Sequence, residues 1–167
     1  MEPSDLIERV WPDAYRIAYS ILDNHADAED AAQDACARMH VSLHQLRNEA
    51  AFPQWFYRIV VNAARERARR RPGHVPLVES AVPSARAVEP DRLDMLDAIA
   101  ALPTSQRMAV IFRYHYGFSD AEVAKILSTT HAAIRVRLFM ARRSLRRSLL
   151  DDSGIVEKNG EIIHERS

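Results

Sequence analysis

A helix-turn-helix pattern between Phe118 and Arg147 constrains this chain more than any other feature of its sequence. Ser119 is suited to cap a first helix, and Glu122, three residues later, completes a capping box. A tight turn follows, and Thr130 is placed to cap a second helix that begins at His131. The stretch therefore predicts two helices in immediate succession, of which the second is long.

The second predicted helix separates apolar from basic residues. Its apolar positions recur every three or four residues and so face inward: Ile134, Leu138, Ala141 and Leu145. The rest of its surface carries six arginines, Arg135, Arg137, Arg142, Arg143, Arg146 and Arg147. A helix-turn-helix places such a recognition helix in the major groove of DNA. The alternative is a helical hairpin whose basic face is only solvated.

The composition indicates an all-α protein. The 167 residues include four glycines, and no stretch alternates apolar and polar residues over the length of a strand. The formal net charge is zero, but the charges are unevenly distributed. Residues 1–50 carry ten acids and four bases, residues 51–71 one acid and six bases, and residues 91–150 five acids and ten bases. This distribution predicts more than one kind of partner surface.

The sequence contains no motif for catalysis or for a cofactor, so we expect a protein that is not an enzyme. Cys36 is the single cysteine, which excludes an internal disulfide and fits a reducing, cytoplasmic location. Cys36, His40 and His44 extend over about 12 Å of one helix, too far to share a metal ion. No apolar run reaches the roughly 18 residues of a membrane span, so no membrane insertion is expected.

Three helices are predicted in residues 1–71, the first helical domain. The first begins at Pro3-Ser4-Asp5, and Pro12 is expected to kink or restart it because proline lacks the N–H group. The second runs from about Asp27 to Leu46, and the third from Pro53 to about Arg71. Each carries an apolar stripe at helical spacing, which predicts that each buries one face.

The second and third predicted helices carry opposite charges. Asp27 and Glu29 suit the first turn of a helix because acids there interact favourably with the helix dipole. Asp34 lies deeper in the helix, so an acidic contact face stays open as an alternative. The third helix ends in five arginines, Arg65, Arg67, Arg69, Arg70 and Arg71. These exceed what a helix C-terminus needs and predict contacts with phosphates.

Residues 72–90 are expected to form a flexible linker, because they contain four prolines and no helical stripe. Residues 91–150 are predicted to form a second helical domain. Its first helix runs from about Asp91 to Leu102, its second begins at Pro103-Thr104 and closes at Gly117, and the helix-turn-helix follows. Residues 151–167 are a polar, weakly patterned tail that is expected to be mobile.

Three segments of the chain carry a resemblance to a known family. They are DAEDAAQDA at residues 27–35, WFYRIVVNAARERARRR at residues 55–71, and residues 102–146, which begin LPTSQRMAVIFRYHYGFSDAEVAKIL. In this order they resemble regions 2.2, 2.3–2.4 and 4 of the extracytoplasmic-function (group 4) sigma factors of bacterial RNA polymerase. The resemblance covers roughly residues 5–148 and implies two small helical domains that direct the polymerase to promoters.

The resemblance implies that the acidic helix binds core RNA polymerase, at the clamp coiled coil of its largest catalytic subunit. The matching residues are Asp27, Glu29, Asp30, Gln33 and Asp34. Their acidic face suits a basic partner helix. Promoter DNA and an anti-sigma factor are the further partners that the resemblance implies.

The resemblance also implies that the 45–53 segment and the third helix recognise and open the promoter −10 element. Flipped bases need a pocket with stacking or cationic groups. Asn62 could read a base edge, and Arg65, Arg69 and Arg70 would hold phosphates. Trp55 heads the apolar stripe and is expected in the core rather than under a base.

The −35 element corresponds to the recognition helix. The residues implied there are Thr130, His131, Ala132, Arg135, Val136, Arg137 and Phe139. The chain departs from the family pattern at Ser128, where the turn often has glycine, and at Met140, where arginine is common. Val136 can touch a thymine methyl group but cannot hydrogen-bond a base edge, so the −35 sequence stays open.

Two other functions remain as alternatives. A stand-alone helix-turn-helix regulator would bind DNA without polymerase, but it would leave the acidic helix and the basic third helix without a role. A sigma-factor mimic would sequester an anti-sigma factor without binding promoter DNA. Such mimics carry a receiver domain, for which this sequence offers no room.

Overall fold

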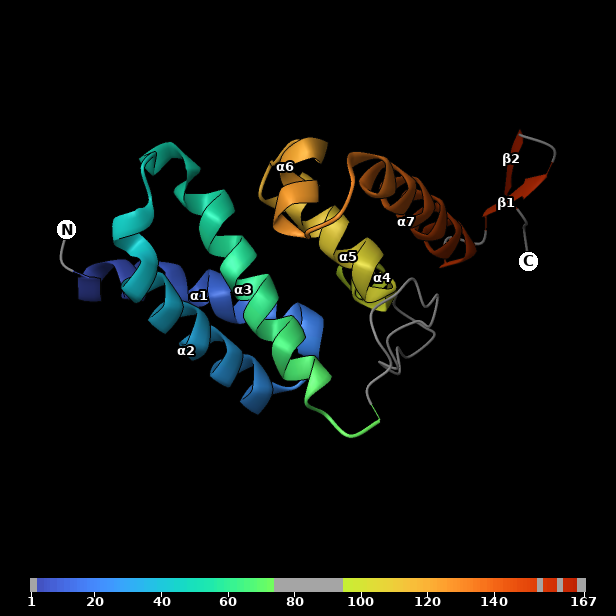
Figure 1. Ribbon diagram of the computed structural model, residues 1–167. Helices are drawn as coiled ribbons and strands as arrows, with labels where there is room; N and C mark the ends of the chain where they lie inside the picture. The colour runs from blue at the N-terminus through green and yellow to red at the C-terminus, as the bar shows by residue number, and fades with distance from the viewer. Residues whose placement is uncertain (1–2, 74–94, 153–154, 159–160, 165–167) are drawn as a thin grey trace.

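The structure, a computed structural model, describes residues 3–73, 95–152, 155–158 and 161–164. These residues are almost entirely helical and form two units, as the sequence predicts (Figure 1). The first unit contains α1 (Pro3–Leu22), α2 (His25–Ser42) and α3 (Phe52–Arg69). The second contains α4 (Met95–Ala101), α5 (Thr104–Val110), α6 (Asp120–Ile126) and α7 (His131–Asp152). The all-α fold is therefore confirmed.

Short irregular helical turns lie between these helices. Two 3-10 turns, Leu43–Gln45 and Glu49–Ala51, connect α2 to α3, and a π-helical turn at Ile111–His115 follows α5. Helix α2 therefore ends before Leu46, the predicted end, because Leu46 has an extended backbone. Helix α1 continues through Pro12, so the helix is not restarted there.

The predicted helix-turn-helix is confirmed together with its caps. Ser119 Oγ accepts the N–H of Glu122 at 3.3 Å, and the Glu122 carboxylate accepts the N–H of Ser119 at 2.8 Å. Thr130 Oγ1 accepts the N–H of Ala133 at 3.1 Å, which caps α7. Ser128, in the turn, has φ +52°, a left-handed conformation that glycine adopts without steric cost. This backbone geometry explains why glycine suits the position.

The chain end contains a feature that the sequence did not indicate. Strand β1 (Ile155–Lys158) pairs antiparallel with β2 (Glu161–His164), with Ile155 opposite His164. The hairpin follows the end of α7 and projects from the helical units in Figure 1. It adds a two-stranded element to a protein whose other described elements are helical.

The two helical units pack directly against each other. Helix α3 contacts α6, and α1 contacts α5. Buried residues of both units belong to one continuous apolar cluster, which includes Ile17 and Phe56 from the first unit and Phe112 and Ile126 from the second. The predicted linker, 72–90, lies mostly in residues 74–94, outside the described residues, so the domain boundary stays a prediction.

A half-buried polar contact joins the units at Asp13. Its carboxylate accepts the hydroxyl of Tyr57, on α3, and the hydroxyl of Tyr116, in the second unit, each at 3.1 Å. The two tyrosine rings lie 4.8 Å apart, and Phe112 and Phe118 pack around Tyr57. Burial, and then the charge of Asp13, raise the pKa of both phenols. Both hydroxyls therefore stay protonated donors around neutral pH.

Two arginines also cross between the units, and each binds a carbonyl at the end of a helix. Arg65, from α3, donates to the carbonyl of Leu127, just after α6, at 2.9 Å. Arg107, from α5, donates to the carbonyl of Ser20 in the last turn of α1, at 2.7 Å. The last carbonyls of a helix lack partners within it and carry partial negative charge, so a guanidinium group there is stabilising.

Candidate nucleic-acid and protein interfaces

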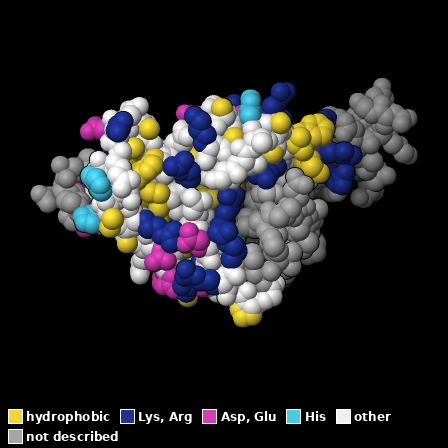
Figure 2. Space-filling view, in the orientation of Figure 1, with side chains coloured by type: hydrophobic (Ala, Val, Ile, Leu, Met, Phe, Trp, Pro, Cys, Tyr) yellow, Lys and Arg dark blue, Asp and Glu magenta, His cyan; other side chains and the backbone are white. Residues whose placement is uncertain are grey.

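The N-terminal end of α2 carries the acidic residues that the sequence singled out, and two of them have partners within the chain. Asp27 accepts Arg67 Nε at 3.0 Å and Arg71 Nε at 2.7 Å. Asp30 forms an ion pair with Arg67. Figure 2 shows basic and acidic side chains side by side over this part of the molecule. This arrangement neutralises part of the predicted acidic face.

The other three residues of that face point outward. Glu29, Gln33 and Asp34 are exposed on α2 and make no hydrogen bond or ion pair within the described part of the chain. Arg38, one turn beyond Asp34, is paired with Glu66 of α3 at 2.9 Å. The free acidic surface of α2 is therefore a narrow strip, narrower than the sequence suggested.

The basic end of α3 divides into two sets of arginines. Three are held within the protein: Arg67 and Arg71 by Asp27, and Arg65 by the Leu127 carbonyl. Arg71 also donates to the carbonyl of Leu22, at the end of α1, at 2.9 Å. The density of arginines in this helix thus has a structural cause that the sequence analysis did not anticipate.

Arg69 and Arg70 form the second set. Both side chains are exposed at the end of α3 and make no hydrogen bond with the described residues. Asn62 lies further back on the same helix and is half-buried. Trp55 packs against the core, with its ring 6.0 Å from that of Phe52, as expected for a core residue. The structure therefore leaves Arg69 and Arg70 as the cations at the basic end of α3 that are available to phosphates.

A pocket of about 480 Å³ lies beside the segment that joins α2 to α3. It is lined by Leu6, Arg9 and Val10 of α1 and by Leu43, Leu46, Glu49 and Phe52 of the connecting segment. The walls thus combine aliphatic side chains, one aromatic ring and two charged groups. Such a lining can enclose a flat apolar group and hydrogen-bond its edge.

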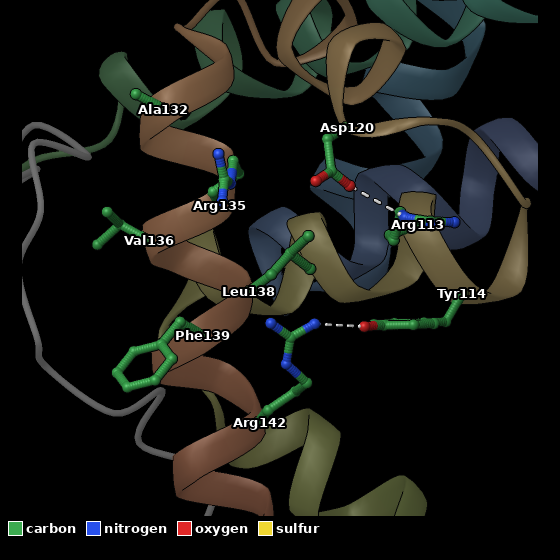
Figure 3. A pocket seen from close by; sticks show the side chains of 9 residues that line it. All are labelled: Arg113, Tyr114, Asp120, Ala132, Arg135, Val136, Leu138, Phe139 and Arg142. Carbon is green, nitrogen blue, oxygen red and sulfur yellow. Dashed lines mark hydrogen bonds and ion pairs between the residues drawn. The ribbon is translucent and has the colours of Figure 1, made fainter.

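The recognition helix lines a groove of about 520 Å³, drawn in Figure 3. Helix α7 contributes Ala132, Arg135, Val136 and Phe139 from the predicted −35 set, together with Leu138 and Arg142. Val136 and Phe139 are 58% and 60% exposed, which is unusual for large apolar side chains. Arg135 is exposed and makes no hydrogen bond within the described residues.

The opposite wall of this groove comes from residues that the sequence analysis missed. Arg113 donates to Asp120 at 3.0 Å, and Arg142 donates to the Tyr114 hydroxyl at 2.8 Å (Figure 3). His131 Nε2 lies 3.9 Å from the other oxygen of Asp120. In the sequence, Met108, Ile111 and Phe112 form the apolar side of the predicted helix after Pro103-Thr104. This pattern places Arg113 and Tyr114 on the outer side of that helix and could have identified them.

Two members of the predicted −35 set lie elsewhere. Thr130 serves as the cap of α7. Arg137 faces the first unit and lines a small cavity that also contains Arg65. The sequence placed these two arginines in separate DNA interfaces, but the packing of the units brings them to one cavity. Among the described residues, no helix is both long and apolar enough to cross a membrane.

These features define a class: a two-unit helical protein with a helix-turn-helix in one unit and an exposed basic helix end in the other. The similarity of this chain to known proteins is consistent with that class. The sigma-70 region 2 family matches residues 6–72, and the sigma-70 region 4 family matches residues 92–145. The ECF RNA polymerase sigma factor SigM of Mycobacterium tuberculosis is 32% identical over 147 residues, covering 86% of this chain and 75% of SigM.

Two further relatives extend the comparison. The ECF sigma factor SigW of Bacillus subtilis is 24% identical over 166 residues, covering 89% of each chain. The sigma factor RpoE, solved in complex with the anti-sigma factor NepR from Bartonella quintana, matches with a TM-score of 0.67. That match has 25% identity and covers 89% of this chain and 97% of RpoE. The chain belongs to the extracytoplasmic-function sigma factors of the sigma-70 family.

The ion pairs of Asp27 generate a prediction about acid stability. Hydrogen bonds from Arg71 and then Arg67 hold the pKa of Asp27 below its ordinary value. A carboxylate whose pKa is lowered by folding contributes stability that is present above its unfolded-state pKa, near 4, and is lost as the pH falls through its folded-state pKa. We expect Asp27→Asn to be less stable than the wild type at pH 7 and to lose less stability on acidification below about pH 4.

Urea unfolding at a series of pH values measures both effects. Glu29→Gln is the matched control, because Glu29 is an exposed acid two residues further along α2 that has no ion pair within the described residues. It should retain the wild-type pH dependence. Parallel pH profiles for Asp27→Asn and the wild type would contradict the role given to these ion pairs.

Proposed function

We propose that this protein binds core RNA polymerase in the cytoplasm and directs it to promoters through a −10 and a −35 element. Family membership supports the general activity. The observation that most supports DNA recognition by this particular chain is the groove along α7, where Arg135, Val136 and Phe139 are exposed. In this account the polymerase supplies the catalysis, and the protein supplies the choice of DNA.

The proposed polymerase-binding surface is the outer strip of α2, formed by Glu29, Gln33 and Asp34. These groups are exposed and free to pair with a basic partner helix. Asp27 and Asp30 also belong to the surface that the family resemblance implies. Because Arg67 binds both of them, we assign them to fixing α3 against α2. They would support the docking strip rather than supply its free charge.

Reversing a charge on this strip should weaken binding to core polymerase. We expect Asp34→Arg to lower the affinity at least tenfold, about 1.4 kcal/mol, because it places a cation against a basic partner. Titration of fluorescently labelled core polymerase measures the affinity. Glu8→Arg is the control, since it makes the same change in charge at an exposed site on α1. Equal affinities for both variants would contradict the assignment of this strip, and no binding of the wild type to core polymerase would favour a regulator that acts without polymerase.

We assign −10 recognition to α3 and to the pocket beside the 43–52 segment. The pocket is large enough for a flipped base, and Phe52 offers a ring for stacking. Glu49 can accept a hydrogen bond from the amino group of a cytosine. Asn62, Arg69 and Arg70 would then contact the strand along α3. Arg65 can join them only after it leaves the Leu127 carbonyl.

We assign −35 recognition to the N-terminal half of α7, the end that enters the major groove in this motif. His131, Ala132, Arg135, Val136 and Phe139 form the base-reading set. Arg113 and Arg142 line the same groove and can hold phosphates on either side of it. The exposed Val136 and Phe139 side chains suit thymine methyl groups.

The role of Arg135 can be tested in transcription and footprinting with purified core polymerase. If Arg135 binds guanine with two hydrogen bonds, Arg135→Ala should cost about 1–3 kcal/mol and relax preference at one base pair. If it binds phosphate, all sequences should weaken alike and the salt slope should fall by about one. Arg147→Ala is the control, because it removes an exposed arginine about 18 Å further along α7.

The wild type should support transcription from its cognate promoter, and Arg147→Ala should retain it. A −35 footprint that is unaltered by Arg135→Ala at every salt concentration would remove this helix from promoter recognition. A wild type that gives neither a footprint nor transcription would favour a sigma-factor mimic, which binds an anti-sigma factor and not DNA. We propose an anti-sigma factor as a partner in either case, because the structurally similar RpoE is solved with one.

Binding both promoter elements requires the two units to separate. Elements at −10 and −35 lie about 25 base pairs apart, which is about 85 Å along B-DNA. In the structure α3 and α6 are in direct contact. The observed arrangement is therefore a closed form that can serve one element at a time, and the promoter-bound form must be more extended.

A further inference from the structure

The interface between the two units contains a small cavity with an excess of positive charge. Its volume is about 30 Å³, and it is lined by Ile21, Val61, Arg65, Thr104, Ser105, Met108, Leu127 and Arg137. Arg65 comes from α3 and Arg137 from α7, so each unit contributes one guanidinium group. The cavity lining contains no carboxylate.

Neither guanidinium group has an anionic partner in the part of the chain that the structure describes. Arg65 uses one N–H on the Leu127 carbonyl, which leaves four of its five donors. Arg137 makes no hydrogen bond with the described residues. Burial, and then the nearby charges of Arg137 and Arg69, lower the pKa of Arg65, which indicates that its positive charge is not compensated.

The rest of the lining favours strong binding of one small anion. Val61, Met108 and Leu127 are almost fully buried, so charges in the cavity are poorly screened by water. Thr104 and Ser105 add two hydroxyl donors on the side of α5. A water-sized group needs about 10–15 Å³ of such a cavity, so the space admits about two oxygen atoms.

We propose that this cavity is a carboxylate-binding site, with Arg65 and Arg137 as its two cationic ligands. A carboxylate offers two oxygens to two guanidinium groups, whereas the four oxygens of phosphate exceed the space. The carboxylate can come from a small free anion or from an acidic side chain of a partner protein. Because the two arginines belong to different units, the bound carboxylate joins the units.

A consequence for transcription rests on the proposed function. The family resemblance implies contacts with the −10 element for Arg65 and with the −35 element for Arg137. A carboxylate that binds both keeps them from promoter phosphates and stabilises the closed form. The site itself does not depend on that function, and its test below uses no DNA.

The test is a titration of the full-length protein with sodium acetate at constant ionic strength, followed by NMR of the arginine Nε–H groups. Arg65 and Arg137 should shift with a common saturation curve. Arg137→Gln should weaken acetate binding at least tenfold, and Ser105→Ala should weaken it severalfold without a change in charge. Arg143→Gln, at an exposed arginine on α7, should leave the affinity within twofold of the wild type.

Two further titrations define the ligand. Inorganic phosphate should bind at least tenfold more weakly than acetate, and equal binding would overturn the assignment to carboxylate. N-acetylglutamic acid amide should match acetate if acidic side chains can enter, whereas binding of acetate alone identifies a free anion as the source. Linear shifts of equal size at all exposed arginines would mean charge screening only and would overturn the site.

Loss of binding in Arg137→Gln is meaningful only if the variant is folded with its units in contact. Its circular dichroism spectrum and its Tyr57 and Tyr116 ring signals should match those of the wild type. Arg137 makes no hydrogen bond within the described residues, so its replacement leaves the Leu127 and Asp13 contacts in place. A folded Arg137→Gln that binds acetate like the wild type would also overturn the proposal.

Discussion

The hydrogen bonds of Asp13 are the interaction on which the arrangement of this protein depends. One carboxylate accepts Tyr57 of the first unit and Tyr116 of the second, within a cluster of packed aromatic rings. The Asp13 side chain is 33% exposed, so its partly desolvated oxygens are stabilised by hydrogen-bond donors, and here the donors come from both units. When the units separate, the aromatic surface between them becomes exposed. Water then replaces the Tyr116 hydroxyl as a hydrogen-bond donor to Asp13.

This contact is of moderate strength, which suits a protein that changes its arrangement. Three hydrogen bonds described above cross between the units: those of Tyr116 with Asp13, Arg65 with Leu127 and Arg107 with Ser20. Each involves a charged group and contributes only about 1.5–3 kcal/mol net, because water replaces the partner after separation. Binding to polymerase and DNA can exceed such a cost.

Much of the fold could be predicted from the sequence, because caps and apolar periodicity are local signals. Ser119, Glu122 and Thr130 marked the helix-turn-helix, and their hydrogen bonds are present. The partners of the charged residues could not be predicted in this way. Asp27 meets Arg67 and Arg71 through the packing of α2 on α3, and Arg65 meets Arg137 through the packing of two units. Local sequence patterns indicated which surfaces carry charged residues. They did not indicate which of those charges are neutralised by partners within the protein.

The distance between the units, free and bound to polymerase, tests this account most directly. Spin labels at Glu8→Cys and Ser144→Cys lie on exposed sites of α1 and α7, and Cys36, only 5% exposed, should stay unlabelled. Electron-electron double resonance should give one short distance in the free protein. With core polymerase and promoter DNA, it should lengthen by roughly 30 Å or more, since the two elements lie about 85 Å apart. An unchanged distance in an active complex would contradict the closed and extended forms described here.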